Sequence, residues 1–156
     1  MASRHPQLSW VFVYTREAHP GEAVPAHDSF ERKLAHARLL RDEAGITRPI
    51  LVDDLEGTGH RPYGSLPNMT WVVDRGGIIA YKASWTVAAN VESFVQRYLG
   101  ARRERRPGAQ LGPYRSEQLE LRNLDRTAFV ARLERNGPAA VEQWNRSQAR
   151  PRPPLG

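Results

Sequence analysis

The sequence predicts an α/β fold, and three observations support this class. Short apolar runs rich in β-branched and aromatic residues recur over the first 99 residues. A stretch between the first two runs has apolar residues at helical spacing. The segment Asp74-Arg75-Gly76-Gly77 has the composition of a tight turn between two further runs, and therefore predicts a hairpin. Strands that alternate with helices in this way are typical of an α/β sheet.

The first predicted strand covers residues 10–14, which are apolar enough for a buried strand. A capping-box pattern follows, with Glu31 three residues after Asp28, and it predicts the start of a helix. Gly45 is expected to end this helix. The next predicted strand covers residues 49–52. The helix carries one apolar face, formed by Phe30, Leu34, Ala37, Leu40 and Ala44.

The second half of this region predicts a hairpin and a final helix. Residues 58–64 are expected to form a short helix or turn, and residues 70–74 and 78–82 the two strands of the hairpin. The final helix is predicted over residues 87–99, with Gly100 as its stop. Its inward face is expected to comprise Val91, Phe94, Val95 and Tyr98. The predicted order is strand, helix, strand, short helix, strand, strand, helix.

The residues after 99 predict a different organisation. Residues 100–113 have the Arg, Pro and Gly content of a linker, residues 114–150 predict a helical extension, and residues 151–156 predict a disordered tail. A short helix is expected to begin at Ser116, and a second helix is expected over residues 125–135. Residues 138–144 are expected to start a third helix, with Pro138 in its first turn. These helices carry too few apolar residues to fold alone. We expect them to dock on the preceding domain through Phe129, Leu133 and Trp144.

Composition limits the possible functions. The chain has no cysteine, which excludes disulfides, thiolate catalysis and thiolate metal sites. Residues 1–99 are neutral, so the whole net charge of +6 lies in residues 100–156. The arginine runs at 102–106 and 146–152 could contact nucleic acid, but we favour a solvated linker and terminus. No apolar run has the length of a membrane span and no signal peptide is evident, so a cytoplasmic protein is expected.

Several motifs occur in the order found in one family of redox proteins. They are E-A-H-P at residues 17–20, V-P-A-H at 24–27, I-L-V-D at 50–53 and Y-G-S-L-P at 63–67, followed by the hairpin at 71–82. Together they resemble the iodothyronine deiodinases and their bacterial redoxin-like relatives. The resemblance covers about residues 8–99. It implies a thioredoxin-like fold that lacks its first strand and nucleophile helix, with a helical C-terminal extension.

The resemblance implies an oxidoreductase that removes halogen reductively or reduces with thiols, using a selenocysteine or cysteine nucleophile. Its partners would be a small-molecule substrate and a thiol reductant, and no cofactor is implied. The family's nucleophile loop would lie upstream of Met1, so the resemblance implies an N-terminally truncated chain that is inactive as written. A histidine or carboxylate does not replace a thiolate as the electron-donating nucleophile.

The resemblance also implies site residues. His19 and Glu17 correspond to catalytic positions, and His27, Leu66, Pro67 and Trp85 to positions that bind substrate. Pro67 occupies the place of the cis-proline of thioredoxin-like folds. From the residues alone, His19 lies at the carboxyl end of a predicted strand, where α/β folds place their sites. A solvent-exposed turn is the alternative interpretation of this histidine.

The other polar candidates are interpreted structurally. His60, Asp53 and Asp54 have no metal-binding spacing, so turn or cap roles are expected and no metal is predicted. His36 falls on the polar face of its predicted helix and is expected to be solvated.

Two other classes of function stay open. The chain could be a non-catalytic binding module that retains the pocket, or an Arg-tailed nucleic-acid-binding protein, whose affinity would fall steeply with salt. In a thioredoxin-like sheet the absent strand would lie between residues 10–14 and 70–74. Its absence would leave unpaired strand edges, and such edges favour homo-oligomers.

Overall fold

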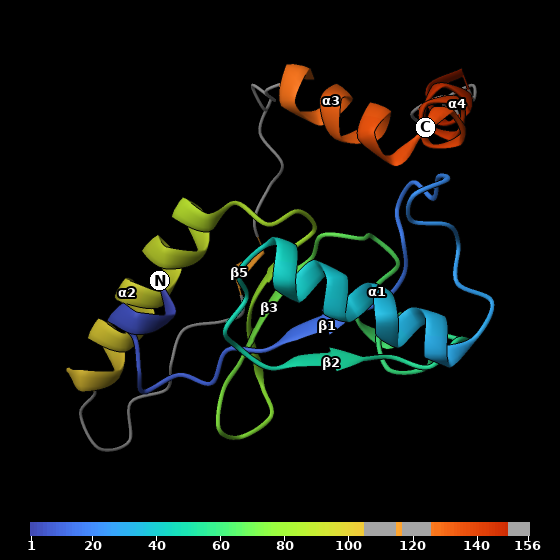
Figure 1. Cartoon of the computed structure of the whole chain (residues 1–156). Helices are drawn as coiled ribbons and strands as arrows, with labels where there is room; N and C mark the ends of the chain where they lie inside the picture. The colour runs from blue at the N-terminus through green and yellow to red at the C-terminus, as the bar shows by residue number, and fades with distance from the viewer. Residues whose placement is uncertain (105–114, 117–125, 150–156) are drawn as a thin grey trace, which may run out of the picture. The chain divides into compact units, whose positions relative to one another are not determined.

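The computed structural model describes residues 1–104, 115–116 and 126–149 (Figure 1). It confirms the α/β class and the predicted order of elements up to the final helix of the first region. The chain divides into two compact units. The first unit comprises Met1–Leu8 and Asn68–Arg122, and the second comprises Ser9–Pro67 and Asn123–Gly156. The partition at residues 1–99, 100–113, 114–150 and 151–156 stays a prediction.

The second unit contains a two-stranded parallel sheet. Strand β1 (Phe12–Tyr14) pairs with β2 (Ile50–Val52), and Tyr14 lies opposite Val52. Helix α1 (Phe30–Glu43) connects the two strands and packs against β2 (Figure 1). A short 3₁₀ helix, η2 (Arg61–Tyr63), follows β2. These elements confirm the positions of the predicted strands and of the short helix or turn. The prediction that the strands are buried is wrong, because Val13 of β1 and Leu51 of β2 are 51% and 57% exposed.

Helix α1 begins one residue later than its capping pattern suggests. The N-cap is Ser29, whose side chain accepts a hydrogen bond from the Arg32 backbone N–H at 3.2 Å. Asp28, the expected cap, instead pairs with the Arg32 guanidinium at 3.1 Å. Both residue types are competent caps, so the pattern alone did not decide between them. Gly45 ends the helix as predicted, because its φ of +59° is a conformation that glycine adopts readily.

The inward face of α1 differs from the predicted apolar face. Lys33 and Ala37 are buried, whereas Phe30 and Leu40 are 45% and 42% exposed. The Lys33 ammonium donates a hydrogen bond to the Asp54 carbonyl oxygen at 2.5 Å. A lysine stem is aliphatic, and it can pack like an apolar side chain when its charged end finds an acceptor.

The first unit contains a three-stranded sheet. Strand β3 (Thr70–Val73) pairs antiparallel with β4 (Ile79–Ala83), which confirms the hairpin. Strand β5 (Arg115–Ser116) pairs parallel with β4. The prediction that Ser116 begins a helix is therefore wrong, and the residues that follow it lie outside the described part of the chain. Helix α2 (Ala88–Arg103) continues past Gly100, so the predicted stop at this glycine is also wrong.

The core of the first unit lies between β4 and α2. The rings of Tyr81 and Phe94 stack at 4.6 Å between centroids, and the Val91 and Val95 side chains are buried. This confirms the predicted inward face of the helix. The N-terminal 3₁₀ helix η1 (Ala2–Arg4) joins this unit through an ion pair between Arg4 and Glu92 of α2.

The helical extension forms two helices in the second unit. Helix α3 (Arg126–Asn136) and helix α4 (Pro138–Ala149) pack against each other (Figure 1). Gly137 connects them with a φ of +110°. Leu133 and Ala140 are their buried residues. Both helices were predicted, and α4 continues from Pro138 past Trp144 to Ala149.

Two features implied by the resemblance differ in the structure. Among the described residues the strands form two separate sheets, β1–β2 and β3–β4–β5. No cis peptide bond occurs among the described residues, so the bond before Pro67 is trans and the expected cis-proline is absent. The coarser assignment to the α/β class stands.

Candidate functional site

Three side chains converge on the carboxylate of Glu17, three residues after the end of β1. The Tyr14 hydroxyl donates a hydrogen bond to it at 2.5 Å, the His27 Nδ1 at 2.6 Å and the His36 Nδ1 at 2.7 Å. An ionised carboxylate only accepts hydrogen bonds, so all three groups must be donors. We call these four residues the Glu17 cluster. They come from β1, from the segment after it and from the inward face of α1.

The Glu17 cluster is shielded from water. The side chains of Glu17, His27 and His36 are 7%, 10% and 11% exposed. Burial by itself would raise the pKa of the Glu17 carboxyl. Hydrogen bonds from Tyr14, His36, the Glu17 backbone N–H and His27 outweigh burial and lower the pKa to about 2. Glu17 is therefore ionised at neutral pH.

Tyr14 is the permanent donor of the cluster. Burial raises the pKa of its phenol well above the ordinary value, and the hydrogen bond and negative charge of Glu17 raise it further. The hydroxyl therefore keeps its proton at all physiological pH values. Tyr14 and His36 both donate to Oε1 of Glu17, and His27 donates to Oε2.

The geometry determines which nitrogen of each imidazole is available for chemistry. Because Nδ1 donates to Glu17, the neutral rings of His27 and His36 carry their proton on Nδ1 and leave Nε2 as the acceptor. No hydrogen bond to either Nε2 atom occurs among the residues that the structure describes. A carboxylate in this position orients an imidazole and stabilises its protonated form. The cluster can thus accept and deliver protons at two Nε2 atoms.

His19 lies in a different environment from Glu17. Its Nδ1 is 3.1 Å from the Gln143 Oε1 of α4. Its ring meets the rings of Phe129 and Trp144 edge-on, at centroid distances of 6.0 and 5.3 Å. The structure therefore brings together Glu17 and His27 of the predicted site and gives His19 other partners. These contacts also confirm the predicted docking of the extension through Phe129 and Trp144.

The remaining predicted substrate positions do not join the cluster. Leu66 and Pro67 are exposed in the second unit. Trp85 is half-buried in the first unit, between β4 and α2. Their assignment to a substrate site stays a prediction.

Sequence reasoning missed two members of the cluster, Tyr14 and His36. The prediction that His36 is solvated is wrong, because its side chain is 11% exposed and hydrogen-bonded to Glu17. His36 lies one helical turn after Lys33, so both project from the same side of α1. Recognising Lys33 as an inward residue would have placed His36 there as well.

A second acid–histidine pair follows β2. The Asp53 carboxylate accepts from the His60 Nδ1 at 2.6 Å and from the backbone N–H groups of Asp54, Gly59 and His60. Burial favours a raised pKa, but these hydrogen bonds, led by that of His60, lower the pKa of Asp53 to about 2. The pair braces the turn, as predicted. Within the described ranges, no group of three or more His, Asp or Glu side chains has the arrangement of a metal site.

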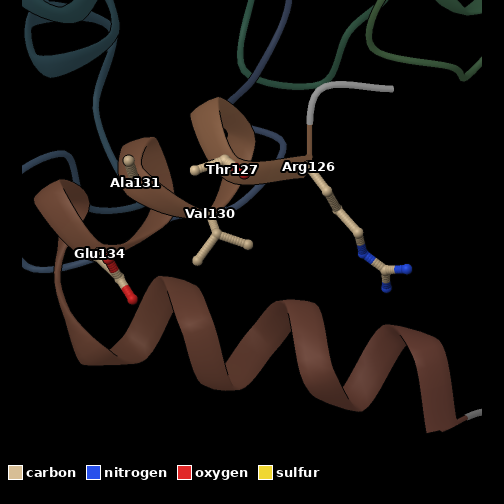
Figure 2. A pocket seen from close by; sticks show the side chains of 5 residues that line it. All are labelled: Arg126, Thr127, Val130, Ala131 and Glu134. Atoms are coloured by element: carbon tan, nitrogen blue, oxygen red, sulfur yellow. The ribbon is translucent and has the colours of Figure 1, made fainter. Parts of the chain in front are cut away.

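One hollow on the second unit lies on α3. It has a volume of about 400 Å³ and is lined by Arg126, Thr127, Val130, Ala131 and Glu134 (Figure 2). No member of the Glu17 cluster lines it, so it is distinct from the candidate site. None of the described helices is long and apolar enough to cross a membrane.

Comparisons with protein-family models, curated proteins and solved structures found no match.

Proposed function

We propose that this chain carries the proton-handling part of a thioredoxin-fold oxidoreductase of the iodothyronine deiodinase family. The observation that carries the proposal is the convergence of Tyr14, His27 and His36 on the Glu17 carboxylate. Glu17 and His27 come from the E-A-H-P and V-P-A-H motifs, which are two of the segments on which the resemblance depends. The hydrogen bond from the His27 Nδ1 to the Glu17 carboxylate joins the two motifs in the folded protein.

The proposed reaction class needs a proton donor, and the histidines of the Glu17 cluster can act as one. Reductive dehalogenation of a phenol replaces the halogen with hydrogen, so the ring carbon gains a proton while a selenolate or thiolate takes the halogen. A histidine Nε2 that is free to donate after protonation can supply that proton. Glu17 keeps its negative charge and stabilises the imidazolium form before transfer.

The electron-donating nucleophile is not among these 156 residues, since the chain has no cysteine. The chain alone should therefore bind a halogenated phenol without turning it over. The same absence favours a second candidate, a binding module that retains the pocket. The two candidates differ in whether the bound phenol reacts faster when a nucleophile is supplied from outside.

A two-stage assay of the full chain tests the proposal. The first stage measures binding of 2,4,6-triiodophenol by titration calorimetry. The second adds a soluble small-molecule selenol and measures iodide release with and without the protein. We expect binding, and release above the rate in solution. His27→Gln and His36→Gln should lose the acceleration, whereas His60→Gln, outside the cluster, should keep it.

The outcomes separate the candidates. Binding without acceleration would favour the binding module. Failure to bind would overturn both the substrate class and the proposed function. Acceleration that survives loss of both His27 and His36 would show that the Glu17 cluster does not handle the proton.

A further inference from the structure

The loop between β1 and α1 is held by the α3–α4 hairpin, which comprises residues 126–149. One residue, Asn136 at the end of α3, makes three hydrogen bonds to this loop. Its Oδ1 accepts from the Val24 N–H at 2.8 Å, and its Nδ2 donates to the His19 carbonyl at 2.9 Å. Its backbone carbonyl accepts from the Ala23 N–H at 3.1 Å. Both ends of the side-chain amide are thus satisfied by loop backbone.

Close backbone contact adds to these hydrogen bonds. A Cβ atom on Gly21 would clash with the Asn136 carbonyl oxygen, so the loop passes the end of α3 at a distance that only glycine allows. The Glu22 carboxylate accepts from the Ala139 N–H at 3.1 and 3.2 Å. This carboxylate lies at the N-terminus of α4, where a negative charge is favourable. The loop therefore contacts the hairpin at Gly21 and Glu22, in addition to the hydrogen bonds of Asn136.

The hairpin also fixes the side chain of His19. Phe129 and Trp144 contact each other at 4.8 Å between centroids and both meet the imidazole edge-on. The Gln143 Oε1 accepts from Nδ1, so Nδ1 carries the proton of the neutral ring. Edge-on aromatic contacts favour one orientation of a ring. Orientation and tautomer of His19 are thus both set by α3 and α4.

We propose that the α3–α4 hairpin is a positioning element for the candidate site, with Asn136 as its central positioning residue. Asn136 holds the backbone from His19 to Val24, and Phe129, Trp144 and Gln143 hold the His19 imidazole. Glu17 lies two residues before this anchored segment, and His27 lies three residues after it. The hairpin therefore fixes the loop that supplies both Glu17 and His27, as well as the ring of His19.

Nuclear magnetic resonance of the full chain with ¹⁵N-labelled backbone and histidines tests the inference. The readouts are amide hydrogen exchange at Val24 and the tautomer of His19. Asn136→Ala should speed exchange at Val24 by about fivefold or more, the effect of losing one hydrogen bond. Asn136→Asp retains an acceptor for the Val24 N–H but loses the donor to the His19 carbonyl, so exchange at Val24 should be slower than in Asn136→Ala and faster than in the wild type. Asn145→Ala, an exposed asparagine on α4, is the matched control and should change neither readout.

A second variant keeps the test decisive if Asn136→Ala does not fold. Gln143 is exposed, so Gln143→Ala should leave the fold intact. It should abolish the preference of His19 for the Nδ1–H tautomer while leaving Val24 exchange slow. The inference is overturned if His19 keeps its tautomer in Gln143→Ala, or if a folded Asn136→Ala exchanges at Val24 like the wild type. Neither readout involves a substrate, so failure here is distinguishable from failure of the proposed function.

Discussion

The Nδ1 of His36 lies 2.7 Å from the carboxylate of Glu17, a residue nineteen positions earlier in the chain. The contact joins the inward face of α1 to the segment that follows β1. It requires that α1 bury a polar side chain, and His36 is 11% exposed. The buried Lys33 on the same side shows that this part of the helix interface is polar and internally hydrogen-bonded.

Replacing Glu17 by glutamine should destabilise the fold in a pH-dependent way. The folded-state pKa of about 2 lies below the ordinary value of 4.5, so the ionised carboxylate stabilises the fold fully above pH 4.5. This contribution is lost as pH falls from 4.5 through 2. We expect Glu17→Gln to cost about 2 kcal/mol at pH 7. Urea unfolding of both proteins between pH 7 and pH 2 should show the gap narrowing in the acid range, and a gap that is constant with pH would contradict the account.

His36→Ala should be destabilising although His36 lies on the face of α1 that the sequence pattern marks as polar. The substitution removes a hydrogen bond to a buried ionised carboxylate, so a loss of about 1–3 kcal/mol is expected. Arg38→Ala, on the same helix and exposed, is the control and should stay within about 0.5 kcal/mol of the wild type. Equal melting temperatures for the two variants would argue that His36 is not engaged in the folded protein.

The turn after β2 should not tolerate a side chain at Gly57. Its φ is +75°, and an added Cβ would lie 2.5 Å from the Cε1 of His60, whose ring is held by Asp53. We expect Gly57→Ala to cost about 1–3 kcal/mol. Gly76→Ala is the matched control, because its surroundings are open and its φ is not positive, and thermal melting should find it nearly neutral. If both variants melt alike, the brace between Asp53 and His60 is looser than described.

One face of the β1–β2 sheet should promote self-association. Val13 and Leu51 lie opposite each other in register and are 51% and 57% exposed. Among the described residues β1 pairs with β2 alone, so its other edge is open to a further strand. Val13→Lys and Leu51→Lys should each weaken concentration-dependent association in sedimentation equilibrium, because a charge on this face opposes close contact of two copies. Ile78→Lys, exposed in the β3–β4 turn, should have no effect. A wild-type protein that is monomeric at every concentration would remove the basis of this prediction.

The elements of the first 99 residues were predictable because their signals are local. Apolar runs, the glycine after α1 and the turn before β4 each depend on a few neighbouring residues. The predictions were wrong where two neighbouring residues fitted the same local rule, or where no local rule described the residue. Ser29 and Asp28 are both good caps, and only packing selects one. Lys33 counts as polar in any helical pattern, although its aliphatic stem is buried here.

The candidate site was predictable only in part, for a physical reason. Glu17 and His27 were proposed from motifs, but the hydrogen bond between them depends on how the chain folds back between two residues ten positions apart. The partners of His19 are further away still, since Gln143 lies 124 residues later. No periodicity or motif near His19 carries information about that contact. The environment of His19 is set by tertiary packing against α3 and α4. Of its partners, the sequence indicated Phe129 and Trp144 only as docking residues and gave no sign of Gln143.

We propose that the Glu17 carboxylate organises His27 and His36. The most direct test is a long-range ¹H–¹⁵N spectrum of histidine-labelled protein at a pH where the rings are neutral. Both rings should carry their proton on Nδ1 in the wild type. In Glu17→Gln at least one ring should lose this preference, because the amide retains only one acceptor oxygen. Two rings with the proton on Nε2 in the wild type, or tautomers unchanged by Glu17→Gln, would contradict the proposal.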